Sequence, residues 1–134
     1  IRTLNFCIKM QIPYYVSVHF CRHFMGVTHF VQTQRNDRQE KYDRTQAPQA
    51  SMVSHMMYIN AQELMFMARR RLCTQADPAT RRVMQEICRQ VIELCPEFDG
   101  TLEPMCSYRG GRCTEFVCCG ANKKYLYKGE QDAE

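Results

Sequence analysis

The stretch MVSHMMYINAQELMFMARRRLCTQADPATRRVMQEICRQVIELC, residues 52–95, carries the clearest structural pattern in this chain. In its second half, apolar residues recur at the three- and four-residue spacing of one helix face. They are Met84, Ile87, Cys88, Val91, Leu94 and Cys95. Asp77 can cap this helix, Pro78 suits its first position, and Pro96 stops the run.

The first half of the stretch, residues 52–73, also fits a helix. Val53, Met57 and Leu64 recur with further methionines around them, which gives a broad apolar face. Two helices joined by a loop of a few residues pack as an antiparallel hairpin. We therefore expect residues 52–95 to form a helical hairpin that is the firmest part of the fold.

The segments before the hairpin differ in character. Residues 32–51 are rich in Gln, Arg and Asp and hold a single aromatic, so they predict a polar linker. Residues 1–31 are apolar and basic, and we expect a helix there that starts near Pro13 and binds a surface or a partner. Uncharged runs of 12 residues on either side of Arg22 are too short for a membrane span of about 20 residues.

The segment after the hairpin, residues 96–134, is cysteine-rich and has a charged tail. Gly100 and the pair at 110–111 mark turns, and residues 114–117 and 125–127 are candidates for short strands. The predicted fold class is therefore mainly α. Its parts are an N-terminal helix, a polar linker, a helical hairpin and a small cysteine-rich segment with short strands, over residues 1–31, 32–51, 52–95 and 96–134.

The nine cysteines form no familiar framework, because their number is odd and their spacing irregular. One or two disulfides are predicted within the C-terminal group, with free thiols as the alternative. This group is Cys106, Cys113, Cys118 and Cys119. A zinc site is disfavoured there because no Cys-x2-Cys pair is present. Cys88 and Cys95 are expected to be core thiols.

Two sets of polar residues are candidate sites. His19 and His23, four residues apart, would project from one face of a helix as metal ligands can, although histidines at an interface are the favoured interpretation. No cofactor is predicted. The arginines of the hairpin could contact acidic proteins, anionic lipid or RNA phosphate, and a solvated, salt-bridged face is the alternative. They are Arg69, Arg70, Arg71, Arg81 and Arg82.

Function is predicted mainly by exclusion. The chain has no phosphate-binding loop, no nucleophile elbow and no H-E-x-x-H motif, so we do not expect an enzyme. No acid precedes Asp37, and acid-poor, Arg-bearing N-terminal segments are typical of mitochondrial proteins. The first residue is Ile1 rather than Met, which suggests a processed or partial chain.

These features predict a non-catalytic accessory subunit of a large mitochondrial assembly, with a respiratory or ATP-synthase complex favoured. Its partners would be other protein subunits, with peripheral contact to anionic lipid. Two alternatives stay open. One is a secreted, disulfide-rich binding protein, which the lack of any Asn-x-Ser/Thr acceptor disfavours slightly. The other is an RNA-contacting subunit, such as a mitochondrial ribosomal protein, that uses the arginines.

Overall fold

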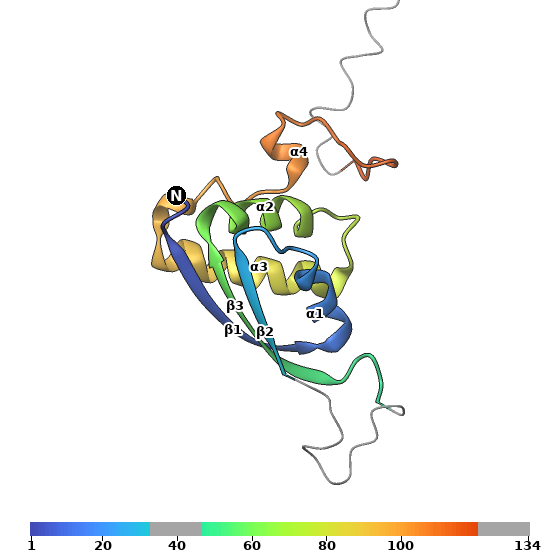
Figure 1. The fold of residues 1–134 in the computed structure, drawn as a ribbon. Helices are drawn as coiled ribbons and strands as arrows, with labels where there is room; N and C mark the ends of the chain where they lie inside the picture. The colour runs from blue at the N-terminus through green and yellow to red at the C-terminus, as the bar shows by residue number, and fades with distance from the viewer. Residues whose placement is uncertain (33–46, 121–134) are drawn as a thin grey trace, which may run out of the picture. The chain divides into compact units, whose positions relative to one another are not determined.

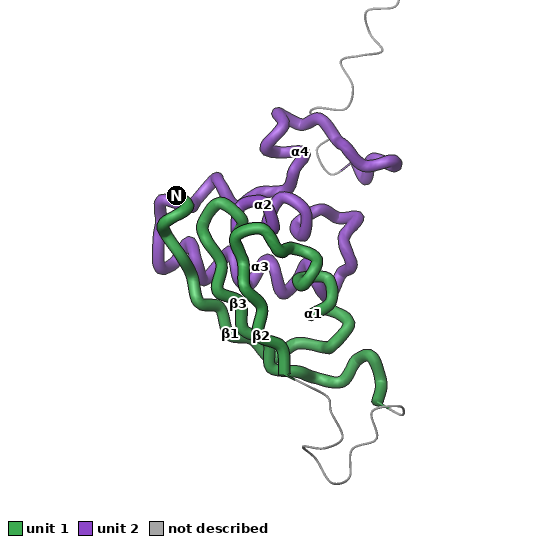
Figure 2. Tube along the Cα trace, in the orientation of Figure 1, with its two compact units in different colours: residues 1–63 green, residues 64–134 purple. Residues whose placement is uncertain are grey.

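The computed structural model describes residues 1–32 and 47–120 and has a mixed α/β fold (Figure 1). The chain divides into two compact units, residues 1–63 and 64–134 (Figure 2). In chain order the elements are β1 (Asn5–Pro13), α1 (Tyr14–Cys21), β2 (Val27–Val31), β3 (Met52–Asn60), α2 (Ala61–Arg71), α3 (Pro78–Leu94), the 3-10 helix η2 (Pro96–Phe98) and α4 (Met105–Tyr108). The mainly α prediction is wrong, because a sheet occupies much of the first unit.

The sheet of the first unit has three antiparallel strands in the order β1-β3-β2. The last of them in sequence, β3, is therefore the central strand (Figure 1). In the register, Met56 of β3 lies between Lys9 of β1 and Phe30 of β2. Alternate side chains of a strand point to opposite faces, and in β3 every second residue is buried. These buried residues are Val53, His55, Met57 and Ile59.

The helix predicted over residues 52–73 is thus wrong in its first nine residues, which form β3. Apolar side chains lie on both faces of this strand, with Met56 and Tyr58 opposite Met57 and Ile59. An apolar run of this kind contains helical and strand spacings at once, so periodicity cannot separate them. Pairing with β1 on one side and β2 on the other favours the strand over the helix.

The single helix predicted within residues 1–31 is also corrected. Phe6, Ile8, Met10 and Ile12 are less exposed than the residues between them, which is the two-residue period of β1. A helix does begin next to Pro13, as predicted, but it ends eight residues later at Cys21. Within the unit this helix, α1, packs on β1 and β3 and buries Val16 and Phe20.

The second unit contains α3, which confirms the prediction made from its sequence. Asp77 is the N-cap, and its Oδ2 atom accepts a hydrogen bond of 2.8 Å from the backbone N–H of Thr80. Pro78 occupies the first turn, and the helix ends at Leu94. The buried face holds Met84, Ile87, Cys88 and Val91 as expected, whereas Leu94 is 78% exposed. Burial raises the pKa of the Cys88 thiol to about 12, as befits a core cysteine.

The remaining predictions have mixed outcomes. The helical part of residues 52–73 is α2, which the turn at residues 72–77 joins to α3. The strand predicted at 114–117 is absent, and residues 115–117 form bends instead. Most of the predicted linker, the second short strand and the charged tail lie outside the described residues. None of the helices in residues 1–32 and 47–120 is long and apolar enough to span a bilayer.

Candidate metal centre

Three potential metal ligands meet inside the first unit, one from each of three elements. Cys21 is the last residue of α1, His29 is the middle residue of β2, and His55 lies in the central strand β3. One ligand atom of each residue lies within 4.8 Å of the other two. Within residues 1–32 and 47–120, no other set of three or more Cys, His, Asp or Glu side chains meets this criterion.

The register of the sheet brings the two histidines together. His29 pairs with Met57, and Val31 pairs with His55, so the histidines are diagonal neighbours on the same face. His29 Nδ1 and His55 Nε2 are 2.9 Å apart. Phe20 packs edge-on against the His55 ring with 6.3 Å between the ring centroids, and Cys21 follows directly in the chain.

The hydrogen bonds define the protonation of both rings. His29 Nε2 lies 2.7 Å from the backbone oxygen of His23, which can only accept, so this nitrogen carries the hydrogen. Nδ1 of a neutral His29 is then an unprotonated acceptor that faces His55. The backbone contact thus fixes the tautomer and the ring orientation of His29, as second-shell hydrogen bonds do for metal-bound histidines.

His55 is a buried, neutral imidazole with one unused nitrogen. Its side chain is only 1% exposed, and burial, with a smaller effect of the neighbouring His29, lowers its pKa to about 4. Nε2 donates to His29, while Nδ1 has no hydrogen-bond partner among the described residues. A histidine pair that served packing alone would explain the 2.9 Å contact, but it would give no part to Cys21, which lies within reach of both rings.

Contacts with Glu63 and Asn60 restrain the loop between α1 and β2, and this loop positions the carbonyl group of His23. The His23 Nδ1 atom lies 3.0 Å from Glu63 Oε1, and both side chains are nearly buried. Burial raises the pKa of the Glu63 carboxyl. Gly26 has a φ of +78°, and a Cβ atom there would collide with the side chain of Asn60. Only glycine therefore fits this turn.

The donor set suits a transition metal of borderline softness. Zinc binds imidazole nitrogen at about 2.0 Å and thiolate sulfur at about 2.3 Å, so tetrahedral neighbours lie about 3.3 to 3.6 Å apart. The two histidine nitrogens need only a small outward adjustment from 2.9 Å. The Cys21 thiol, whose pKa is raised by desolvation, belongs to an exposed residue and can move toward them. Three protein ligands leave a fourth position for water or another donor.

The histidines singled out in the sequence lie elsewhere or act indirectly. Helix α1 ends at Cys21, so His19 is helical and His23 is not, and the four-residue helical spacing does not apply to them. His23 supports the cluster through its backbone oxygen. The alternation of β2 and β3 is the signal that would have identified His29 and His55, because it places both on the inward face.

The predicted interaction arginines have different environments. The guanidinium of Arg69 stacks over the ring of Tyr108 at 3.5 Å, which ties α2 to α4 within the second unit. Arg81 donates to the backbone oxygen of Thr74 at 3.2 Å. Arg70 and Arg82 are exposed, while Arg71 is half-buried. Arg69 and Arg81 thus make contacts within the chain. The role of the five arginines in binding a partner stays a prediction.

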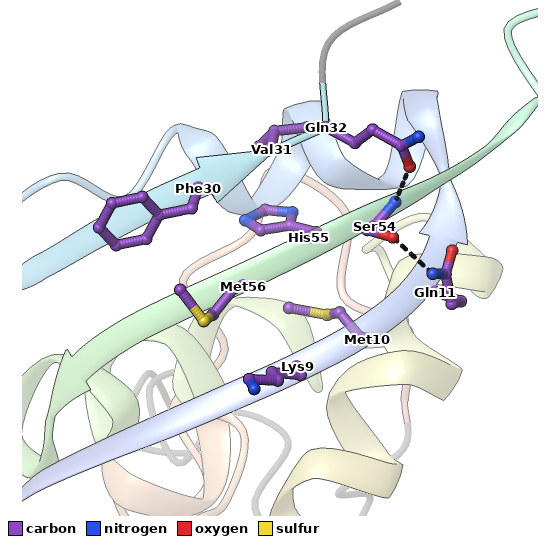
Figure 3. Close-up of a pocket in the computed structure, with 9 residues that line it drawn as sticks. All are labelled: Lys9, Met10, Gln11, Phe30, Val31, Gln32, Ser54, His55 and Met56. Atoms are coloured by element: carbon purple, nitrogen blue, oxygen red, sulfur yellow. Dashed lines mark hydrogen bonds between the residues drawn. The ribbon is translucent and has the colours of Figure 1, made fainter.

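The other face of the sheet, here called the outer face, carries a shallow groove of about 550 Å³ (Figure 3). Phe30 is 53% exposed there and lies beside the half-exposed Met56. Polar residues border them: the Ser54 backbone donates to Gln32 Oε1, and Gln11 Nε2 donates to Ser54 Oγ (Figure 3).

Comparison with known proteins gave no match: no family model, no curated protein sequence and no solved structure matches this chain. The case for a function therefore depends on the residues and geometry of the chain itself.

Proposed function

We propose that the first unit, residues 1–63, is a metal-binding module whose ion is held by Cys21, His29 and His55. The observation that carries this proposal is the paired arrangement of the imidazoles. His29 Nε2 donates to a backbone oxygen at 2.7 Å, so its Nδ1 lone pair is directed at a second, neutral imidazole 2.9 Å away. A thiol stands within 4.8 Å of both rings.

Zinc is the ion we favour. Mixed nitrogen and sulfur ligands suit Zn²⁺, whereas Mg²⁺ and Ca²⁺ prefer oxygen. A bound ion would join the end of α1 to β2 and β3, and would therefore stabilise the unit as any ligand of the folded state does. This role is structural, in keeping with the non-catalytic function that the sequence predicts.

Zinc titration of the chelator-treated full chain, followed by NMR of the histidine rings, tests the proposal. All four histidines of the chain lie in residues 1–63, so their signals report on this unit alone. We expect the ring signals of His29 and His55 to change until one equivalent of zinc is bound, while those of His19 stay constant.

Two cysteine variants sharpen this test. Cys21→Ser removes the thiolate ligand and should abolish the change at equimolar zinc. Cys7→Ser is the matched control, because Cys7 is also exposed but points to the outer face of the sheet, opposite Tyr58. If the rings of His29 and His55 do not respond to several equivalents of zinc, the proposal is wrong.

A second proposal concerns the outer face. We propose that this face docks on another protein, as an accessory subunit of a larger assembly would; the mitochondrial location remains a prediction from the sequence. Phe30 and Tyr58 are 53% and 51% exposed and both are neighbours of Met56, while polar Lys9 and Gln11 of β1 lie on the same face beside Met56 and Ser54; apolar residues with polar ones around them are typical of a protein interface.

Pull-down of the full chain from a mitochondrial extract, compared with a Phe30→Ser, Tyr58→Ser variant, tests the second proposal. The variant should lose a stoichiometric partner that the unmodified chain retains, while its far-ultraviolet circular dichroism stays the same. Phe24→Ser is the control, since Phe24 is 76% exposed but lies in the α1–β2 loop and not in a strand of the sheet. Equal recovery of all partners by the three chains would argue against docking at this face.

A further inference from the structure

The strand β1 forms one edge of the sheet, because the strand order is β1-β3-β2 (Figure 1). It pairs with β3 over all nine of its residues, and the register has no interruption. The other edge strand, β2, has only five residues. An edge strand presents a row of backbone groups that no neighbouring strand pairs with. The longer of the two open edges of this sheet is therefore the one along β1.

Two hydrogen bonds just beyond the ends of β1 show which of its backbone groups face outward. The Ala61 N–H donates to the Leu4 carbonyl oxygen at 2.8 Å, and the Tyr14 N–H donates to the Ser51 carbonyl oxygen at 2.9 Å. Both pairs continue the β1–β3 register. Hydrogen-bonded residues alternate along an antiparallel strand, so the even-numbered residues of β1 bond to β3 and the odd-numbered ones face away from it. The outward residues before the terminal proline are Asn5, Cys7, Lys9 and Gln11.

These four outward residues have no backbone partner on the open side. Within residues 1–32 and 47–120, no backbone hydrogen bond reaches their N–H or carbonyl groups from beyond the sheet. Each residue carries one donor and one acceptor, so the edge offers both kinds of group at every second position. This regular row is what an extended peptide uses when it adds to a sheet as a further strand.

The edge also lacks the features that usually prevent such pairing. Sheet edges are commonly protected by prolines, by bulges or by several charged side chains. In β1 the only proline is Pro13, its last residue, and the only charged residue is Lys9. The unbroken register with β3 leaves no room for a bulge. A nine-residue edge of this kind is therefore suited to pairing with another strand.

The inward side chains of β1 indicate what that strand would carry on one face. Phe6, Ile8 and Met10 are only half-buried, whereas Met57 and Ile59 of the central strand are fully buried. An added strand would place its own inward side chains beside the three residues of β1. Cross-strand neighbours of this kind stabilise a sheet when both are apolar. We therefore expect apolar residues at alternate positions of the partner.

The charge of the edge indicates the other face of the partner. Lys9 lies opposite Met56 of β3, and residues 1–36 contain no Asp or Glu. An acidic residue directly opposite Lys9 would form a favourable cross-strand pair. A second copy of β1 complements this edge poorly, because the register with full overlap sets Lys9 opposite the same lysine of the other copy. Like charges in that position are destabilising.

We propose that the open edge of β1 binds an extended acidic segment of a partner protein, which adds to the sheet as a fourth strand. The backbone groups of the outward residues supply the hydrogen bonds, and Lys9 selects an acidic side chain at the centre of the segment. This interaction uses the edge of the sheet rather than its outer face. It also needs no ion at the candidate metal centre.

The probe is a monomeric synthetic peptide as long as β1, in which threonine and valine alternate and a glutamate replaces the central threonine. Amide hydrogen exchange of the full, metal-free chain is measured by NMR with and without this peptide. The even-numbered amides of β1 should exchange slowly in both samples, because they bond to β3. The peptide should slow exchange at Cys7, Lys9 and Gln11 by at least about tenfold.

Modified peptides test the role of the main chain. Residues that face each other in a hydrogen-bonded pair both direct their N–H groups at the partner strand. With the glutamate opposite Lys9, the threonine and glutamate amides of the peptide therefore face β1 and the valine amides face away. Methylation of the threonine and glutamate amides should abolish binding, whereas methylation of the valine amides should preserve it.

A charge reversal tests the choice of an acidic partner. Lys9 is exposed, so Lys9→Glu should keep the fold and weaken binding of the glutamate peptide by about three- to tenfold. A peptide with lysine in place of the glutamate should restore the affinity of this variant. Arg22→Glu is the matched control, since Arg22 is an exposed cation outside the sheet, and it should bind as the unmodified chain does.

Three results would overturn the proposal. One is unchanged exchange at Cys7, Lys9 and Gln11 in a large molar excess of peptide, and another is equal binding of the two methylated peptides. The third is protection of the same amides that grows with chain concentration in the absence of peptide, because a second copy would then occupy the edge. The Phe30→Ser, Tyr58→Ser variant should bind the peptide normally, so failure at the edge is distinguishable from failure at the outer face.

Discussion

Replacing single residues of β3 tests whether these residues form the observed strand or a helix. Ile59 is fully buried on the inward face of the sheet, between Phe6 of β1 and Val27 of β2. Ile59→Ala removes three carbons, worth about 0.8 kcal/mol each, and leaves a cavity, so the free energy of unfolding should fall by about 3–4 kcal/mol. For a chain of this size that lowers Tm by about 10–15 °C.

Met56→Ala is the matched comparison, three residues earlier. Met56 is half-exposed on the outer face of the strand, so its truncation should cost less than about 1 kcal/mol. In a helix over residues 52–73, Met56 would instead share a face with residues 53 and 60 and lie next to Met57. The strand thus predicts a strong effect at Ile59 and a weak one at Met56.

Urea unfolding of the metal-free chain, followed by far-ultraviolet circular dichroism, measures both losses. Chelation is needed because bound zinc would add its own stabilisation and shift the midpoints. Equal losses for the two variants, or a larger loss at Met56, would refute the alternation of β3 and with it the alignment of His29 with His55.

Three further outcomes follow from local contacts. Asp77→Ala removes the N-cap of α3 and should lower the free energy of unfolding by about 1 kcal/mol in thermal melts, while Asp77→Asn should retain most of it. Arg69→Gln removes the stacking on Tyr108 and should speed hydrogen exchange in α4 without changing α3. The folded pKa of His55 is about 4 and its unfolded value about 6.5, so the unfolded state takes up the proton first. The metal-free chain should therefore be fully stable above about pH 6.5 and lose up to about 3 kcal/mol as the pH falls to 4, and His55→Gln should flatten this dependence in urea midpoints.

The sequence predicted those elements whose signals are local. Helix α3 has an N-cap, a proline in its first turn and a clean apolar period, and these signals agree with one another. The strands, in contrast, form by pairing between segments that are far apart in sequence. In β1 the partners of residues 5–13 lie at residues 52–60, beyond the segment predicted to be a linker. Period alone could not reveal that pairing, and β3 is apolar on both faces.

The candidate metal centre was hidden for the same reason. His29 and His55 are 26 residues apart and meet only through strand register, and no short motif describes that arrangement. Residue type marked histidines as candidate ligands, but the sequence singled out His19 and His23, and which histidines meet depended on the tertiary fold.

The polar side chain of His55 fits poorly in its buried, apolar environment, and this mismatch supports a functional role for the residue. Its neighbours on the inward face of β3 are Val53, Met57 and Ile59, all buried and apolar. A buried polar group without a partner costs about 1–3 kcal/mol, and an apolar residue would avoid that cost. His29 satisfies only one nitrogen of the ring. A chain selected for stability alone would place an aliphatic residue at this position, so we infer that the imidazole is retained for what it binds.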